Sequence, residues 1–160
     1  ARFALRTLGL PQVKTLATIG APHQGTPLAQ WGVAHRERGS WLYWFLRALG
    51  YDLRALSFVG EMTPEFLQKH ATQFEKVPSV RYGSAQGVCQ THCHGGLQWV
   101  GKWGMGASLA GDGLVPSQSQ QWGENLGTYD LDHLSEVGTD SAKHAIRAQW
   151  LEQCWQFMTR

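Results

Sequence analysis

Asp112 and His133 are the two residues of this sequence whose types and order point most directly to chemistry. Asp112 lies in the segment Gly-Asp-Gly-Leu-Val-Pro at 111–116, and His133 follows later in Asp-His-Leu. In a Ser–Asp–His triad the histidine takes the proton of the nucleophile, while the acid fixes the imidazole tautomer and stabilises the imidazolium. Taken alone, an aspartate between two glycines is typical of a turn, and a lone histidine is typical of a surface. Their order, their spacing and their place in loops after expected strands strengthen a catalytic interpretation, while the turn and surface interpretations stay open on the residues alone.

The nucleophile that would complete such a triad has no motif in the chain. A serine nucleophile of this kind sits in Gly-x-Ser-x-Gly, on a sharp turn from a strand into a helix. The segment Gly-Ala-Ser-Leu-Ala at 106–110 is one residue short of it. Only three residues separate Ser108 from Asp112, which leaves no room for the helix. The residues therefore predict the acid and the histidine of a triad without their nucleophile.

The elements that must position this pair alternate between helices and apolar strands. That alternation predicts one layered α/β domain over residues 1–160. Helices are expected at 2–9, 28–35, 63–74 and 141–158, and strands at 13–19 (buried and parallel), 79–83 and 127–131. On the last helix we expect an apolar face of Ala145, Ile146, Trp150, Leu151, Cys154 and Phe157.

An unbroken apolar block, Trp-Leu-Tyr-Trp-Phe-Leu, occupies 41–46. It is too apolar all round for a surface helix. Two interpretations stay open: a helical lid or acyl-chain wall within 36–75, or an ordinary core helix. In the first, Trp41, Trp44 and Phe45 are the candidate substrate-binding residues.

The amino-acid composition says less about function than these motifs do. The 42% hydrophobic and 16% charged content fit a globular protein, and a formal net charge of +2 gives no reason to expect nucleic acid as a partner. The segment 89–94, Cys-Gln-Thr-His-Cys-His, holds four soft metal ligands but lacks a second ligand pair at zinc-finger spacing. We expect Cys89 and Cys93 to form a disulfide or to be free thiols rather than to bind a metal.

Four segments resemble bacterial triacylglycerol lipases and related esterases of the α/β-hydrolase class. Residues 18–29 are similar to the family's Thr-Pro-His-Arg-Gly-Ser stretch, and 111–115 to Asn-Asp-Gly-Leu-Val, whose Asp is the triad acid. Residues 119–124 resemble Ser-Ala-Arg-Trp-Gly-Glu, and 132–134 match the segment of the catalytic histidine. The matches follow family order over roughly residues 1–137. The resemblance assigns Asp112 as the acid and His133 as the base.

The resemblance also implies a fold, a substrate and a setting. The fold would be the C-terminal part of an α/β-hydrolase, with a lid-like insertion. The substrate would be an ester or lipid, with transient contact at a lipid interface, no cofactor, and a secreted or periplasmic bacterial location. In some relatives a calcium ion is bound by an Asp two residues after the catalytic histidine; Ser135 stands there, so no metal site is predicted. The resemblance gives His23 no triad role, and we expect it to brace its loop.

The start of the chain, Ala-Arg-Phe-Ala-Leu, resembles a position a few residues past the family's nucleophile elbow. The serine and the oxyanion donors would then lie upstream, and the 160 residues alone would be inactive. The alternative is a non-catalytic fragment or binding module of the same fold. An open sheet edge would also favour pairing with the upstream half.

Overall fold

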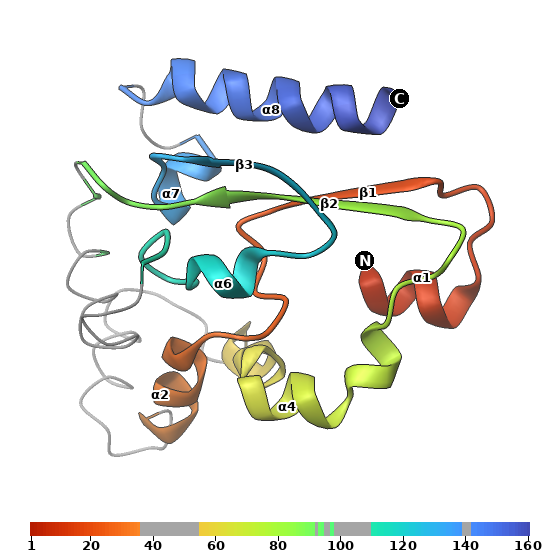
Figure 1. Cartoon of the computed structure of the whole chain (residues 1–160). Helices are drawn as coiled ribbons and strands as arrows, with labels where there is room; N and C mark the ends of the chain where they lie inside the picture. The colour runs from red at the N-terminus through yellow and green to blue at the C-terminus, as the bar shows by residue number, and fades with distance from the viewer. Residues whose placement is uncertain (36–54, 92, 95–96, 98–109, 139–141) are drawn as a thin grey trace.

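Three parallel strands form the sheet at the centre of the structure (Figure 1). The computed structural model describes residues 1–35, 55–91, 93–94, 97, 110–138 and 142–160. Within them β1 (Thr15–Ile19), β2 (Arg81–Gly87) and β3 (Glu124–Tyr129) lie in that order. Thr15 pairs with Arg81 and Ile19 with Ala85, and β2 continues against β3 with an irregularity between Ser84 and Gln86. The expected α/β class is confirmed.

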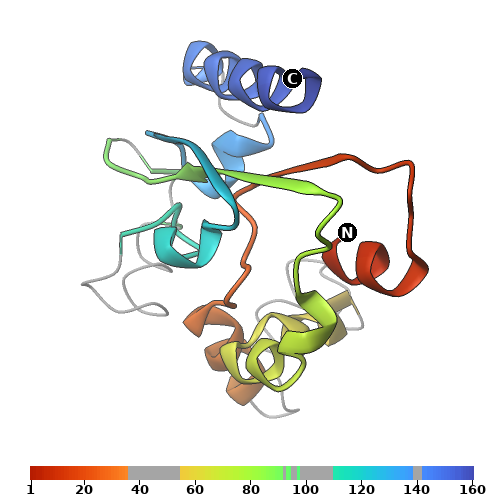
Figure 2. The ribbon, with the colours of Figure 1, turned by 45° about the vertical axis from the view of Figure 1, so that its right-hand side comes forward.

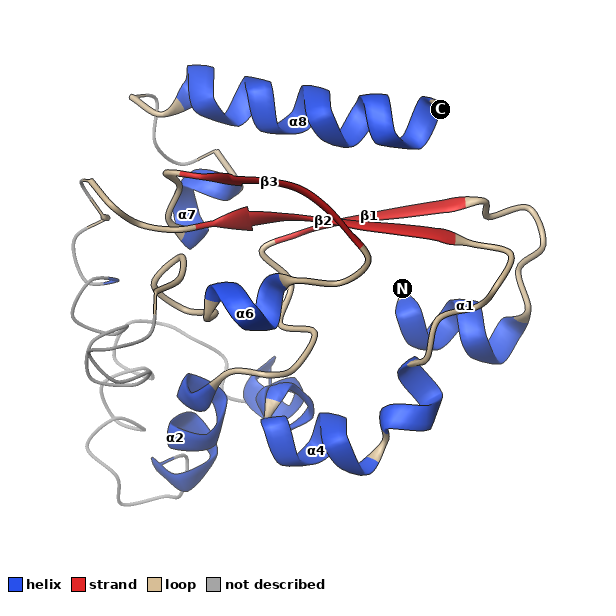
Figure 3. Ribbon diagram, viewed as in Figure 1, coloured by secondary structure: helices blue, strands red, loops and turns tan. Residues whose placement is uncertain are grey.

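Helices cover both faces of this sheet (Figures 1 and 3). The long helix α8 (His144–Thr159) lies across one face, and the turned view shows the helices that precede β2 in the chain on the opposite side of the sheet (Figure 2). None of the described helices is long and apolar enough to cross a membrane. The remaining helices are α1 (Arg2–Leu8), α2 (Pro27–His35), η1 (Ala55–Met62), α4 (Pro64–Lys69), η2 (Ala71–Phe74), α6 (Ser117–Gln120) and α7 (His133–Glu136).

The two faces of β2 carry separate apolar cores. Successive side chains of a strand point to opposite faces. Tyr82 accordingly packs with Leu5 of α1 on one side, whereas Ala85 packs with Leu131 and Trp150 on the other. Trp150 is fully buried, which fixes α8 against the sheet.

Local sequence signals set several element ends as expected. Gly9 ends α1 in the left-handed conformation at φ 56°, which glycine adopts without steric cost. Thr63 caps α4 through its side chain, which accepts a hydrogen bond from the N–H of Phe66 at 3.2 Å. The expected helix at 63–74 is interrupted at His70, where α4 gives way to η2.

Several expectations about the elements were wrong in detail. β2 begins two residues after the start of the expected strand at 79–83 and ends four residues beyond it. Ala145, expected on the apolar face of α8, is exposed. β1 is half-buried rather than buried, because within the described sheet only β2 flanks it. β3 begins at Glu124, three residues before the expected strand. Leu151 is 50% exposed, because it projects from α8 to one side of the buried Trp150.

Other expectations fall partly outside the described residues. Trp41, Trp44, Phe45 and Ser108 all lie there, as does 36–54 of the predicted lid. The rest of that segment forms η1, α4 and η2, and its role as a lid stays a prediction. Of the alternatives for the two neighbouring cysteines, the structure has the disulfide, Cys89–Cys93.

Candidate active site

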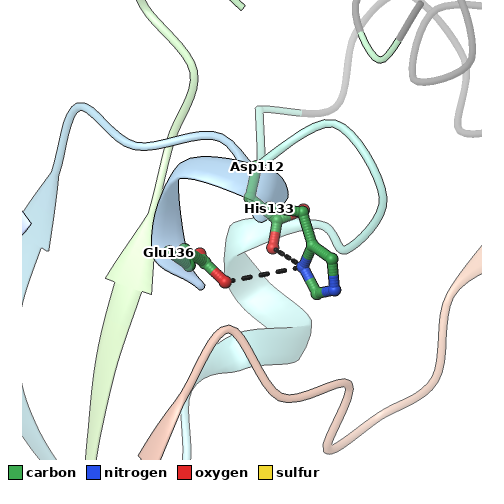
Figure 4. Close-up of side chains that lie close together, drawn as sticks. All are labelled: Asp112, His133 and Glu136. Atoms are coloured by element: carbon green, nitrogen blue, oxygen red, sulfur yellow. Dashed lines mark hydrogen bonds and ion pairs between the residues drawn. The ribbon is translucent and has the colours of Figure 1, made fainter. Parts of the chain in front are cut away.

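Asp112 and His133 meet at the carboxyl end of the sheet (Figure 4). His133 Nδ1 lies 2.9 Å from Asp112 Oδ2. The aspartate is fully buried, while the side chain of His133 is 34% exposed. Since a carboxylate can only accept, Nδ1 carries the proton of this hydrogen bond and Nε2 holds a free lone pair. Nε2 points away from both carboxyl groups in Figure 4, where it can take a proton from a third group.

The turn that holds Asp112 uses the other oxygen of the same carboxylate. Oδ1 accepts hydrogen bonds from the N–H groups of Leu114 (2.8 Å) and Val115 (2.7 Å), and Gly111 and Pro116 close the turn with an antiparallel bridge. Asp112 therefore both forms the turn, through Oδ1, and binds His133, through Oδ2. This arrangement fixes the carboxylate before any substrate arrives.

The side chain of Gln120 links that turn to the end of β2, a role that no sequence motif predicted. Its side chain is fully buried. The amide nitrogen donates to the carbonyls of Gly87 and Val115, both at 3.0 Å, and its oxygen accepts from the N–H of Gly87 at 2.8 Å. Gln120 lies in the segment 119–124 that resembles the lipase family, but a glutamine there does not by itself predict a buried side chain that hydrogen-bonds two loops.

Asp132 places His133 at the first position of α7. Its Oδ1 accepts from the N–H groups of Leu134 and Ser135, and its Oδ2 from that of His94. Burial alone would raise the pKa of Asp132, but these hydrogen bonds outweigh it and lower the pKa. The N–H of His133 also donates to the carbonyl of Asp112 at 2.9 Å, so backbone and side chain join the same two residues.

The electrostatics of the pair favour the charged imidazolium. The hydrogen bond to Asp112 raises the pKa of His133; burial opposes this, and the negative charges of Asp112 and Asp132 add to the rise. A histidine that gains basicity beside a fixed carboxylate is suited to accept a proton during a reaction.

Glu136 is the site residue that sequence reasoning missed. Its Oε2 lies 3.5 Å from His133 Nδ1, and its side chain is 3% exposed. Burial raises the pKa of Glu136 to about 9, and the neighbouring Asp112 carboxylate adds to the rise. An acid three residues after the histidine, on the same short helix, was the signal available.

Among the described residues, Asp112, His133 and Glu136 form the one group whose possible metal-ligand atoms converge, lying within 4.8 Å of one another. Both oxygens of Asp112 and Nδ1 of His133 are already engaged in hydrogen bonds. An ion would have to displace the Asp112–His133 bond, so the donor set fits a proton-handling pair better than a metal centre.

His23 lies in a separate network. Arg2 Nη1 approaches His23 Nδ1 at 3.1 Å, and a guanidinium can only donate, so Nδ1 accepts. His23 Nε2 then carries the proton and donates to Thr18 Oγ1 at 2.9 Å. The His23 ring stacks on Trp122, and burial, with the positive charge of Arg2 beside it, lowers the pKa of His23 to about 4. The network fits the bracing role expected for His23.

A cavity of about 320 Å³ lies beside this network, and neither member of the Asp112–His133 pair lines it. Phe58, from the end of the apolar stretch that follows the block at 41–46, is half-exposed and lines it together with Met62 and Leu67.

Comparison with solved structures identifies the overall fold. A mature lipase of Bacillus licheniformis matches 99% of the chain with a TM-score of 0.69 at 18% identity, over 60% of its own length. A lipase of Staphylococcus hyicus matches 92% of the chain with a TM-score of 0.61 at 15% identity, over 57% of its own length. A metagenomic carboxyl esterase matches 91% of the chain with a TM-score of 0.64 at 16% identity, over 48% of its own length. The chain has the fold of these α/β-hydrolase lipases and esterases. It spans 60% or less of the length of these three structures. No protein-family model matches the sequence, and a search of curated proteins found no match.

Proposed function

We propose that this chain is the C-terminal part of a serine-dependent carboxylic-ester hydrolase of the lipase type. The observation that carries the proposal is the 2.9 Å bond between His133 Nδ1 and a fully buried Asp112 whose second oxygen is already fixed by its own turn. The shared fold with lipases and esterases, and the order of the motifs along the chain, support it.

The chemistry assigned to the pair is general base and then general acid catalysis. His133 Nε2 takes the proton of a serine hydroxyl as the serine oxygen attacks the ester carbonyl. Asp112 holds the Nδ1 proton and stabilises the imidazolium. His133 then protonates the departing alcohol, and the acyl group stays on the serine. A water molecule, deprotonated by His133, releases the acid and restores the serine.

The serine and the oxyanion donors are proposed to lie upstream of Ala1. In this fold the donors are the N–H after the nucleophile and one from an earlier loop. Asp112 and His133 would supply the proton transfer, and the upstream half would supply the attacking oxygen.

Hydrolysis of p-nitrophenyl acyl esters tests the proposal. We expect the protein extended upstream to hydrolyse them, and His133→Ala to abolish the activity, while the exposed His144→Ala leaves it unchanged. The 160 residues alone should show no turnover that depends on His133. Full activity of the extended protein with His133→Ala would refute the proposal, whereas no hydrolysis by the extended wild-type protein would favour a binding role.

A further inference from the structure

The Glu136 carboxyl group fills a space left by two glycines, each at the carboxyl end of a strand. Gly20 follows β1 and Gly87 ends β2, and a Cβ at either position would collide with the Glu136 carboxyl group. Gly20 also has φ +53°, a conformation that favours glycine. The sheet therefore leaves a space at its carboxyl end that the Glu136 side chain fills.

In this position the Glu136 side chain is a second carboxyl group beside the Asp112–His133 pair. Among the described residues, the ionisable groups around Glu136 are Asp112 from the 111–116 turn, Asp132 just before α7 and His133 at its start, while the ends of β1 and β2 contribute glycines. Glu136 Oε1 is buried and has no hydrogen-bond partner among the described residues. A buried, charged carboxylate next to another carboxylate is costly, because the charge is desolvated and the two groups repel, and protonation removes that charge.

We propose that Glu136 is a positioning residue of the Asp112–His133 pair, seated as a neutral carboxylic acid that donates a hydrogen bond to the Asp112 carboxylate. Its raised pKa agrees with this state at neutral pH. The catalytic consequence rests on the proposed function. A second negative charge at this distance would hold His133 in its protonated form, which cannot accept a proton from serine. Neutral Glu136 steadies Asp112 without adding that charge.

Carboxyl and imidazole NMR titrations of the chain test the state of Glu136 without any need for activity. We expect the Glu136 ¹³Cδ resonance to titrate near pH 9, and Glu136→Gln, which keeps a neutral donor, to leave the His133 pKa within about 0.5 unit of wild type. Glu136→Leu, which has no donor, should broaden or lose the low-field His133 Nδ1 proton signal. The exposed Glu152→Gln serves as control.

A Glu136 titration below pH 6, or identical spectra for the Gln and Leu variants, would overturn the proposal. If the Leu variant does not fold, the wild-type titration decides by itself.

Ester hydrolysis by the upstream-extended protein supplies the catalytic readout. We expect Glu136→Gln to stay within about twofold of wild type and Glu136→Leu to lose about tenfold in kcat with KM unchanged, the pattern of a lost transition-state interaction. Equal kcat values in the two variants would refute the positioning role. If instead His133→Ala remains active while the titrations come out as expected, the proposed function fails and the neutral state of Glu136 stands.

Discussion

The buried His23 makes the stability of the fold fall with acidification. Its side chain is neutral in the folded protein because it is buried, with only 7% of the residue exposed, and because the positive charge of Arg2, which donates to Nδ1, also opposes protonation. The folded pKa is about 4, against an ordinary value of 6.5. Between these values the unfolded chain binds more protons than the folded one, so the stabilisation is complete above pH 6.5 and is lost as pH falls toward 4.

The size of this effect follows from the pKa shift. Each pH unit between 6.5 and 4 changes the unfolding free energy by at most about 1.4 kcal/mol for one group, so acidification from 6.5 to 4.5 costs up to about 2.5 kcal/mol. Partial relaxation around Arg2 would reduce this figure but not its sign.

Urea denaturation followed by tryptophan fluorescence at several pH values measures the effect. We expect His23→Gln, which is neutral throughout, to lose most of the slope between pH 6.5 and 4.5 relative to wild type. The exposed His144→Gln should keep the wild-type slope. Parallel curves for wild type and His23→Gln would refute the assignment of His23 as a buried neutral histidine.

Three further predictions concern the site and the core. Glu136→Gln should gain stability over wild type as pH rises from 5 to 9, by at most about 1.4 kcal/mol per unit, because a raised folded pKa costs stability as pH increases; denaturation at pH 5, 7 and 9 checks the sign. Asp112→Asn should reduce kcat of the upstream-extended protein by about a thousandfold or more, since an amide favours the wrong imidazole tautomer; undiminished ester hydrolysis would exclude Asp112 as the acid. Trp150→Ala should lower the unfolding free energy by about 3–5 kcal/mol, whereas Trp155→Ala, 61% exposed on the same helix, should cost less than about 1 kcal/mol; equal losses in urea denaturation would contradict the packing of α8.

The α/β class and several helix ends were predictable because they rest on local signals. The glycine at position 9 and the Thr63-Pro64 pair act within one turn of their helices. The start of β3 was not predictable in this way. Gly123 and Gly127 both weaken a strand pattern. Gly123 is required by a tertiary contact, because a Cβ there would collide with Tyr82 of β2, whereas a Cβ on Gly127 would meet Tyr129 of the same strand.

The candidate pair was predictable in identity but not in environment. Residue type and order singled out Asp112 and His133 as candidates, and the resemblance to lipases assigned their roles. The roles of Gln120 and Glu136 depend on where loops from different strands meet, and no periodic pattern encodes that meeting. Leu151 shows the converse: it was assigned to the apolar face of α8 from the pattern, yet it lies next to Trp150 in sequence and projects to one side of it.

Covalent labelling with a fluorophosphonate, which reacts with an activated serine and releases fluoride, tests the central claim most directly. The protein extended upstream of Ala1 would be labelled, digested and analysed by mass spectrometry, with His133→Ala in parallel. We predict one adduct, on a serine upstream of Ala1, that disappears in His133→Ala. An adduct on Ser108, or labelling unchanged by His133→Ala, would contradict the claim that Asp112 and His133 activate an upstream nucleophile.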